Sequence, residues 1–191
     1  MKTLTRKFYK RDPVQVAKDL LGKILVHRMN HAEISGRIVE TEAYVENDIA
    51  SKTLSRRKVF GQLTSQNCGT TFIYMVHGNW LLNIIAHPKG GMGGVLIRAI
   101  EPIRGIETMK KNRNVEDQRN LTSGPGKLTK ALAITNELNK TDVARIDAKI
   151  AIIEDDPATF EIGSSHRIGV THDLPQELRF FIKANRYVSK P

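Results

Sequence analysis

Strand-like segments, rather than helices, fill the middle of this sequence. Short runs rich in valine, isoleucine, leucine and threonine recur there, and turn-forming residues separate them. Between two of these runs lies Gly78-Asn79, one of the dipeptides that favour a two-residue turn in a β-hairpin. We therefore expect a core of short strands that is largely antiparallel. The predicted strands are residues 23–28, 34–44, 70–77, 80–87, 94–100, 149–154 and 178–183.

Helical patterns surround these strands. Asp12 can cap a first helix that begins at Pro13, and Gly22 can end it. The chain has 191 residues with no internal repeat or linker, a length that suits one domain. The predicted fold class is therefore α+β, a single compact domain over residues 1–191 with a largely antiparallel β core and surrounding helices. The other predicted helices are residues 105–113 and 126–134.

The charge of the chain indicates a class of partner. Thirty Lys and Arg residues stand against twenty Asp and Glu, a formal net charge of +10. Such a surplus favours nucleic acid first and a membrane surface second, although a merely basic protein fits it equally well. No apolar run approaches the ~20 residues of a membrane-spanning helix, and the N-terminus lacks the apolar segment of a secretion signal. Cys68 is the one cysteine, which excludes an internal disulfide and a multi-cysteine zinc site.

These features predict a chain that works inside the cell, in the cytoplasm or nucleoid. We expect no membrane association, no cofactor, no metal and no obligate protein partner.

Two carboxylates and a phenol alternate along one predicted strand. Glu40, Glu42 and Tyr44 project to the same side, because alternate residues of a strand share a face. Such a group suits a site that activates water beside an aromatic platform. A solvated strand face is the ordinary alternative. A metal-dependent nuclease using Glu40 and Glu42 is another, which the lack of a third acidic ligand or an adjacent catalytic lysine disfavours.

The predicted hairpin carries Tyr74, His77 and Asn83. His77 falls at the turn, where a protruding ring has a suitable shape for a wedge inserted into a base stack. Tyr74 lies three residues earlier and could line a pocket. A core tyrosine and an exposed turn histidine are the ordinary interpretations of these two residues.

Two further features involve buried charge and phosphate binding. Arg98 lies in an apolar strand and must be paired, because burying a lone guanidinium is very costly; Glu42 is a natural partner. Ser123, Gly124 and Lys127 belong to a glycine-rich turn before a helix, where free backbone N–H groups and a lysine can bind phosphate. The spacing differs from that of a nucleotide-binding P-loop.

Five segments in order resemble the alkyladenine (3-methyladenine) DNA glycosylase family, to which vertebrate and bacterial alkylpurine glycosylases belong. The similarity runs from about Phe8 to Ser189. The segments are Gly36–Tyr44 (GRIVETEAY), Val95–Pro102 (VLIRAIEP), Ser123–Leu128 (SGPGKL), Arg167–Val170 (RIGV) and Asn185–Ser189 (NRYVS).

The resemblance implies a mechanism in which a damaged purine is flipped out of duplex DNA and water hydrolyses its glycosidic bond. Glu42 matches the general base, Arg98 matches an arginine that holds the water, and Ile168 matches a residue whose backbone carbonyl does the same. No lysine adduct and no strand cleavage are expected.

The resemblance also implies roles in binding. Tyr44 and Tyr74 match aromatics that sandwich the flipped base, and Asn83 matches a pocket asparagine that disfavours a 2-amino purine. His77 falls, after a small gap, where many relatives place an intercalating tyrosine, so the hairpin is expected to insert into DNA.

The sequence departs from the family at one side of the pocket. Relatives usually carry a histidine that contacts the flipped nucleotide, and Lys52 stands at the matching position, in a loop one residue shorter. The usual Met-Phe pair before a Pro-Gly turn is also replaced, by residues 64–69. Lesion preference therefore stays open, as does the alternative of a damaged-DNA-binding relative with weak or no catalysis.

Overall fold

The computed structural model describes residues 2–29, 32–46, 48, 67–155 and 159–190. Its strands are β1 (Ile24–Met29), β2 (Ala32–Val45), β3 (Thr71–Val76), β4 (Asn79–Ile85), β5 (Gly93–Arg104), β6 (Ile150–Ile153), β7 (Ile162–Ser165) and β8 (Arg179–Ile182). Its α-helices are α1 (Arg6–Tyr9), α2 (Pro13–Leu20), α5 (Ile106–Arg113) and α6 (Pro125–Ala131), and 3-10 helices lie at Gln118–Asn120 and Asn136–Leu138.

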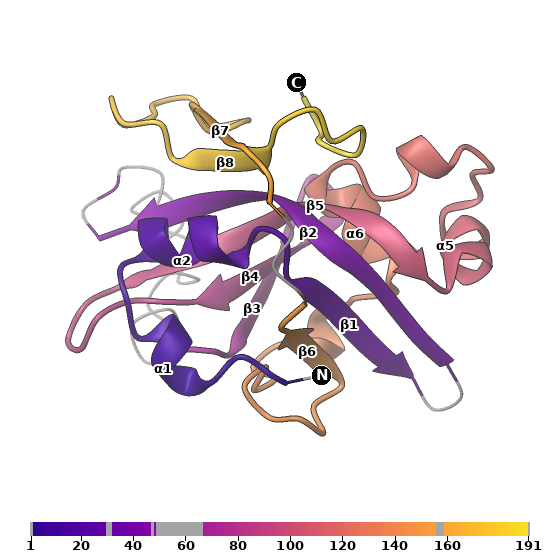
Figure 1. Cartoon of the computed structure of the whole chain (residues 1–191), viewed down its shortest axis with the longest axis horizontal. Helices are drawn as coiled ribbons and strands as arrows, with labels where there is room; N and C mark the ends of the chain where they lie inside the picture. The colour runs from indigo at the N-terminus through magenta and orange to yellow at the C-terminus, as the bar shows by residue number, and fades with distance from the viewer. Residues whose placement is uncertain (1, 30–31, 47, 49–66, 156–158, 191) are drawn as a thin grey trace.

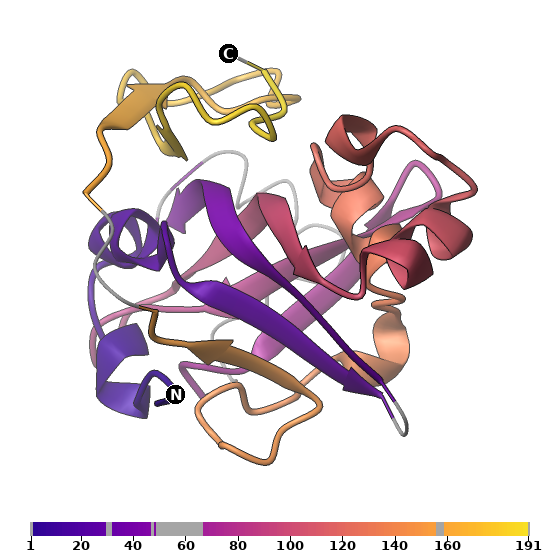
Figure 2. The same cartoon turned by 45° about the vertical axis from the view of Figure 1, so that its right-hand side comes forward.

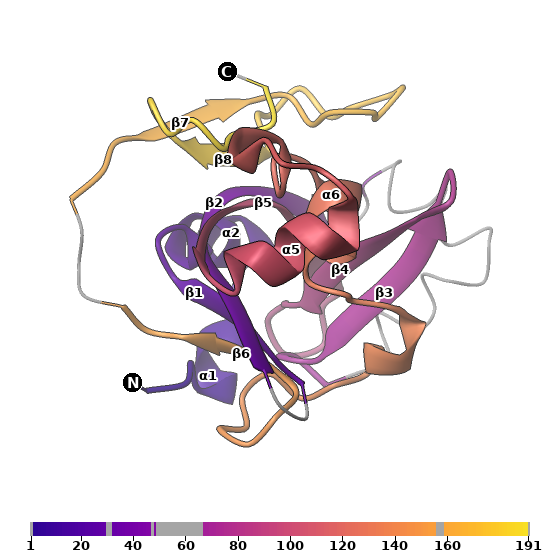
Figure 3. The same cartoon turned by 90° about the vertical axis from the view of Figure 1, so that its right-hand side faces the viewer.

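One curled antiparallel sheet joins all of these strands (Figure 1). Its main path runs β3-β4-β5-β2-β1-β6, while β8 pairs with β2 and β7 pairs with β8. Figure 3 shows β7 and β8 lying across one side of the molecule, beside the C-terminus. The predicted α+β class with an antiparallel core is confirmed.

Strand β2 is the centre of the sheet and has partners on both edges. Most of its length pairs with β5, whereas its other edge pairs first with β1 and then with β8. The register with β5 shifts on both sides of Glu40. Irregularities of this kind bend a strand and redirect its side chains, here at the point where β8 joins.

The helices cover the sheet from two sides (Figure 2). Asp12 caps α2 by accepting from the N–H groups of Val14 and Gln15, and the buried side chains of Val16 and Leu20 pack into the core. Helices α5 and α6 pack together on the other side, where α6 contacts β4 and β5. None of the helices within the described part of the chain is long and apolar enough to cross a membrane.

The hairpin between β3 and β4 turns one residue earlier than predicted. His77 and Gly78, rather than Gly78 and Asn79, form its two-residue loop, because Val76 pairs with Asn79. Both loop residues have a positive φ, +46° and +75°, as the turn favoured in tight hairpins requires. The side-chain amide of Asn79 donates to the His77 carbonyl oxygen at 3.0 Å, which supports this backbone.

Other bounds differ modestly from the predictions. Strand β5 continues to Arg104, and α6 ends at Ala131 rather than near residue 134. Helix α1 (RKFY) and strand β7 (IGSS) were not predicted, because neither has the apolar run that marks the equally short strands β6 (IAII) and β8 (RFFI).

Candidate active site

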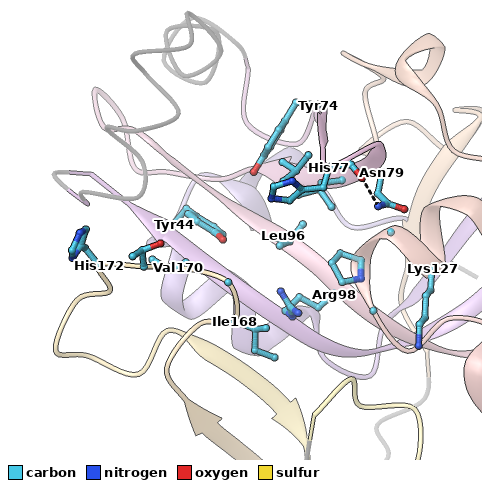
Figure 4. Close-up of a pocket in the computed structure, with 17 residues that line it drawn as sticks. Tyr44, Tyr74, His77, Asn79, Leu96, Arg98, Lys127, Ile168, Val170 and His172 are labelled. Carbon is cyan, nitrogen blue, oxygen red and sulfur yellow. Dashed lines mark hydrogen bonds between the residues drawn. The ribbon is translucent and has the colours of Figure 1, made fainter.

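A cavity of about 840 Å³ opens between the sheet, the β3–β4 hairpin, the start of α6 and residues 168–172 (Figure 4). Tyr44 from β2 and Tyr74 from β3 enter it from two different strands. Arg98 and Ile168 line it near Tyr44, and Lys127 lines it on another side. The volume falls within the ~300–1,000 Å³ typical of sites for small ligands.

Glu42 lies directly beneath the wall of this cavity and is fully buried. Its Oε1 accepts from the backbone N–H of Ile168 at 2.8 Å and lies 3.1 Å from Nη1 of Arg98. Its Oε2 accepts from the hydroxyl of Tyr44 at 3.1 Å. All three partners line the cavity, so the carboxylate is one layer from the space where a ligand would sit. The predicted pairing of Arg98 with Glu42 is confirmed.

Burial gives this carboxylate an unusual proton affinity. Loss of water around it raises the pKa of Glu42 above its ordinary value. Arg98, the Ile168 N–H and the Tyr44 hydroxyl oppose that rise, whereas the charge of Glu40 adds to it. A carboxylate with a raised pKa is a stronger proton acceptor when it is ionised, as a general base near neutral pH should be.

Tyr44 is held on two sides. Its hydroxyl donates to Glu42, and the guanidinium of Arg167 lies over its ring at 4.7 Å. Burial, followed by the charge of Glu42, raises the pKa of Tyr44 well above its usual value, so the phenol remains a donor. The ring is therefore a fixed, neutral surface beside the cavity.

Arg167 is a residue of the site whose role sequence reasoning missed, although it lies in a segment that carried the resemblance. Its side chain has no exposed surface and forms ion pairs with Asp48 and Asp173. It also donates to the carbonyl oxygen of Ala43 at 3.1 Å, on β2. These contacts fix the backbone that carries the Ile168 N–H to Glu42. The sequence could have indicated this role only through acidic residues close to Arg167. Asp48 lies 119 residues away along the chain, so no local pattern shows the pair.

The remaining predicted residues are placed as follows. His77 is exposed at the hairpin tip and lines the rim of the cavity. Asn83 is 5% exposed, donates to the carbonyl oxygen of Phe72 at 3.2 Å, and is not one of the described residues that line the cavity. Lys52 lies outside the described residues.

Gly124, at the N-cap of α6, and Lys127, in its first turn, line the cavity, and the preceding Ser123 forms a bridge with Ala99. Nζ of Lys127 donates to Oδ1 of Asn120 at 2.5 Å. A Cβ on Gly126 would come within 2.8 Å of the Asn79 side chain, so this glycine lets the start of α6 approach the hairpin closely.

Arg98 engages both Glu42 and Glu40, since its Nε donates to Oε1 of Glu40 at 3.0 Å. Within the ranges that the structure describes, no three His, Cys, Asp or Glu side chains gather as a metal site would require. An arginine between two carboxylates disfavours their joint use as ligands for a cation.

Comparison with known proteins finds one matching family and many similar sequences. The sequence pattern of a family described as Methylpurine-DNA glycosylase (MPG) matches residues 7–186. Curated relatives with 3-methyladenine DNA glycosylase in their names are similar along almost their whole length. One from Salinibacter ruber is 37% identical over 203 residues, covering 99% of this chain and 97% of the relative. One from Methanoculleus marisnigri is 38% identical, covering 98% of this chain and 99% of the relative. One from Clostridium novyi is 38% identical, covering 100% of both chains.

Proposed function

Because the chain belongs to the methylpurine-DNA glycosylase family, we propose that it flips a damaged purine out of duplex DNA and hydrolyses its glycosidic bond. Family membership makes it a DNA glycosylase, a hydrolase that acts in DNA repair. The observation that carries the proposal is a fully buried carboxylate, Glu42, directly behind a cavity that two tyrosines line. Under this proposal the product is an abasic site.

The cavity would receive the extruded base. Tyr44 and Tyr74 offer aromatic faces from two strands, and stacking between such faces is how flipped bases are commonly held. An alkylated or deaminated purine stacks or pairs less well in the duplex, which lowers the cost of extrusion, normally a few kcal/mol. Asn83 and Lys52 remain proposed contributors to base selection.

Glu42 would act as the general base for water. Arg98 and the Ile168 backbone border the carboxylate on the cavity side, so a water must approach it between them. As the bond between C1′ and the purine nitrogen breaks, its electron pair leaves with the purine and the ionised carboxylate stabilises the oxocarbenium-like sugar. The water oxygen then bonds to C1′ and its proton passes to Glu42. Water is the nucleophile, so no lysine adduct forms and the strand is not cut.

The surface around the cavity supports a duplex partner. His77 stands at the tip of an exposed hairpin and is proposed to fill the gap that the extruded nucleotide leaves. Gly124 and Lys127, with Ser123 behind them, are proposed to bind the phosphates beside it. A net charge of +10 favours attraction to the DNA backbone.

A base-release assay tests the proposal directly. Duplexes that contain a methylated purine or hypoxanthine are incubated with the enzyme, with and without EDTA, and the free base is measured. We expect release of at least one base, an abasic product and no effect of EDTA. Binding to abasic-site DNA without release of any base would favour the non-catalytic relative, and strand cutting that EDTA abolishes would favour a nuclease.

Replacement of His77 with alanine should weaken binding to lesion duplexes by about tenfold or more, because extrusion costs a few kcal/mol and the wedge offsets part of it. Release from a single-stranded substrate should change little, since no gap has to be held open there. Titration of labelled duplexes and single-turnover rates on both substrates measure this.

His77→Tyr, which restores a large ring at the same position, should recover binding. Equal losses on duplex and single strand in His77→Ala would show that this residue is not the wedge.

A further inference from the structure

Glu40 is a buried ionisable group that the proposed chemistry does not use. It has no exposed surface and accepts four hydrogen bonds. Its Oε1 accepts from Nε of Arg98 at 3.0 Å, Nε of Arg179 at 2.7 Å and Oγ of Ser189 at 2.8 Å. Its Oε2 accepts from the backbone N–H of Ser189 at 2.7 Å. One carboxylate therefore ties together β2, β5, β8 and the C-terminal segment.

Arg98 is shared between two carboxylates. Its Nε donates to Glu40 and its Nη1 lies 3.1 Å from Glu42, so the guanidinium is held at both ends. Arg98 also lines the cavity beside Ile168. The position of this guanidinium, and hence of any water that it helps to hold beside Glu42, is therefore tied to Glu40.

Four buried charged side chains around Glu40 and Glu42 neutralise one another. Two carboxylates, Glu40 and Glu42, face two guanidinium groups, Arg98 and Arg179. Arg179 is also the cross-strand partner of Glu42 in the pairing of β2 with β8. With Glu40 neutral, two arginines would share the one remaining carboxylate, and Glu42 would become a poorer proton acceptor.

We propose that Glu40 is a positioning residue that holds Arg98 and Arg179 in place and, through its negative charge, keeps Glu42 an effective proton acceptor. This inference rests on the proposed function of Glu42 as the general base. Glu40 itself does not reach the cavity.

The groups around Glu42 determine in which direction its pKa shifts when the charge of Glu40 is removed. Arg98 from β5 faces it, as do Tyr44 from its own strand and the Ile168 N–H, while Arg167, Tyr74 and Arg179 lie around these partners. Burial raises the pKa of Glu42 first, and the charge of Glu40 raises it further. Base release should therefore be lost as the pH falls through this raised pKa. Removal of the Glu40 charge should move that loss to lower pH.

The experiment measures single-turnover base release from lesion duplexes against pH for the wild type, Glu40→Gln and Glu40→Asp. Gln keeps the shape without the charge, so the acid midpoint should fall to lower pH and the plateau rate should also drop. Asp keeps the charge with a shorter reach, so the plateau should drop at least tenfold with little change in the midpoint, because misplacing catalytic groups by about 1 Å can cost 10²-fold. Glu161→Gln, at an exposed ion pair with Lys183 on the same β7–β8 layer, is the matched control.

Melting curves and titration with abasic-site DNA count the folded, competent molecules in each sample, so rates refer to active sites. If Glu40 served only to stabilise the fold, its replacement would lower the number of competent molecules but leave the acid midpoint and the plateau rate per active site unchanged. That result would overturn the proposal. If Glu40→Gln does not fold, an unaltered plateau in Glu40→Asp overturns it equally. A wild type that releases no base would instead defeat the proposed function, and this inference with it.

Discussion

Glu42→Gln should lower the single-turnover rate of base release by about 10²–10⁴-fold, the usual contribution of general-base catalysis. Glutamine keeps the size of the side chain, and its one amide oxygen can still accept from the Ile168 N–H while its amide nitrogen donates to the Tyr44 hydroxyl oxygen. It cannot take a proton from water. Binding to abasic-site DNA should remain close to that of the wild type, because Glu42 lies behind the cavity wall rather than on the DNA-facing surface. Rates and titrations on the same preparations measure both quantities.

Stability provides the control for this variant. The folded-state pKa of Glu42 is raised, so the stability that its protonated form confers at low pH is lost as the pH rises through that pKa. Glutamine is neutral at every pH and does not carry the desolvation cost of a buried carboxylate, while Arg98 keeps Glu40 as its partner. Glu42→Gln should therefore stay folded at neutral pH, with a stability close to that of the wild type. Undiminished turnover in a folded Glu42→Gln would show that another group activates the water.

Arg167→Met should lower the free energy of unfolding by about 3–5 kcal/mol, the range for breaking a buried ion pair from one side. Methionine fills much of the space, but Asp48 and Asp173 would face each other without their shared cation. The segment that carries the Ile168 N–H to Glu42 would lose its anchor, so base release per folded molecule should also fall. Denaturant unfolding and single-turnover rates measure the two effects.

The pH dependence of stability shows whether the loss in Arg167→Met comes from the broken ion pair with Asp173. Burial raises the pKa of Asp173, but hydrogen bonds from the Arg167 side chain and from backbone N–H groups outweigh it, and the net pKa is lowered. The stability that this carboxylate contributes is present above the ordinary aspartate pKa and is lost as the pH falls through the lowered one. Arg167→Met should flatten that acid-side loss. Arg145→Met, at an exposed pair with Asp147, should change stability very little, and an equal effect of both variants would refute the role of burial.

Local sequence signals predicted the frame of the site because they report local physics. Alternation marked β2 and placed Glu40, Glu42 and Tyr44 on one side, and the cost of a buried charge required a partner for Arg98. The hairpin was predicted, but its loop was misplaced by one residue, because the Gly78-Asn79 signal outweighed the less common positive φ of His77.

The rest of the site depends on contacts that no local pattern carries. Arg167 meets Asp48, and Glu40 meets Ser189, across 119 and 149 residues of chain. Strand β7 (IGSS) carries no apolar run that would mark it as a strand. The engagement of Arg179 with Glu40 requires the pairing of β8 with β2. The resemblance identified Ile168, whereas the structure adds that its N–H donates to Glu42.

The hydrogen bonds between Glu40 and Ser189 have a consequence for folding during synthesis. A ribosome synthesises β2 long before β8 and Ser189, and contacts that close such long loops tend to form slowly. A nascent chain that has exposed β2 through β5 still lacks two of the groups that neutralise and hold Glu40. If Glu40 has the positioning role proposed above, the site is complete only after the late segment docks, and activity on DNA should begin only after that step.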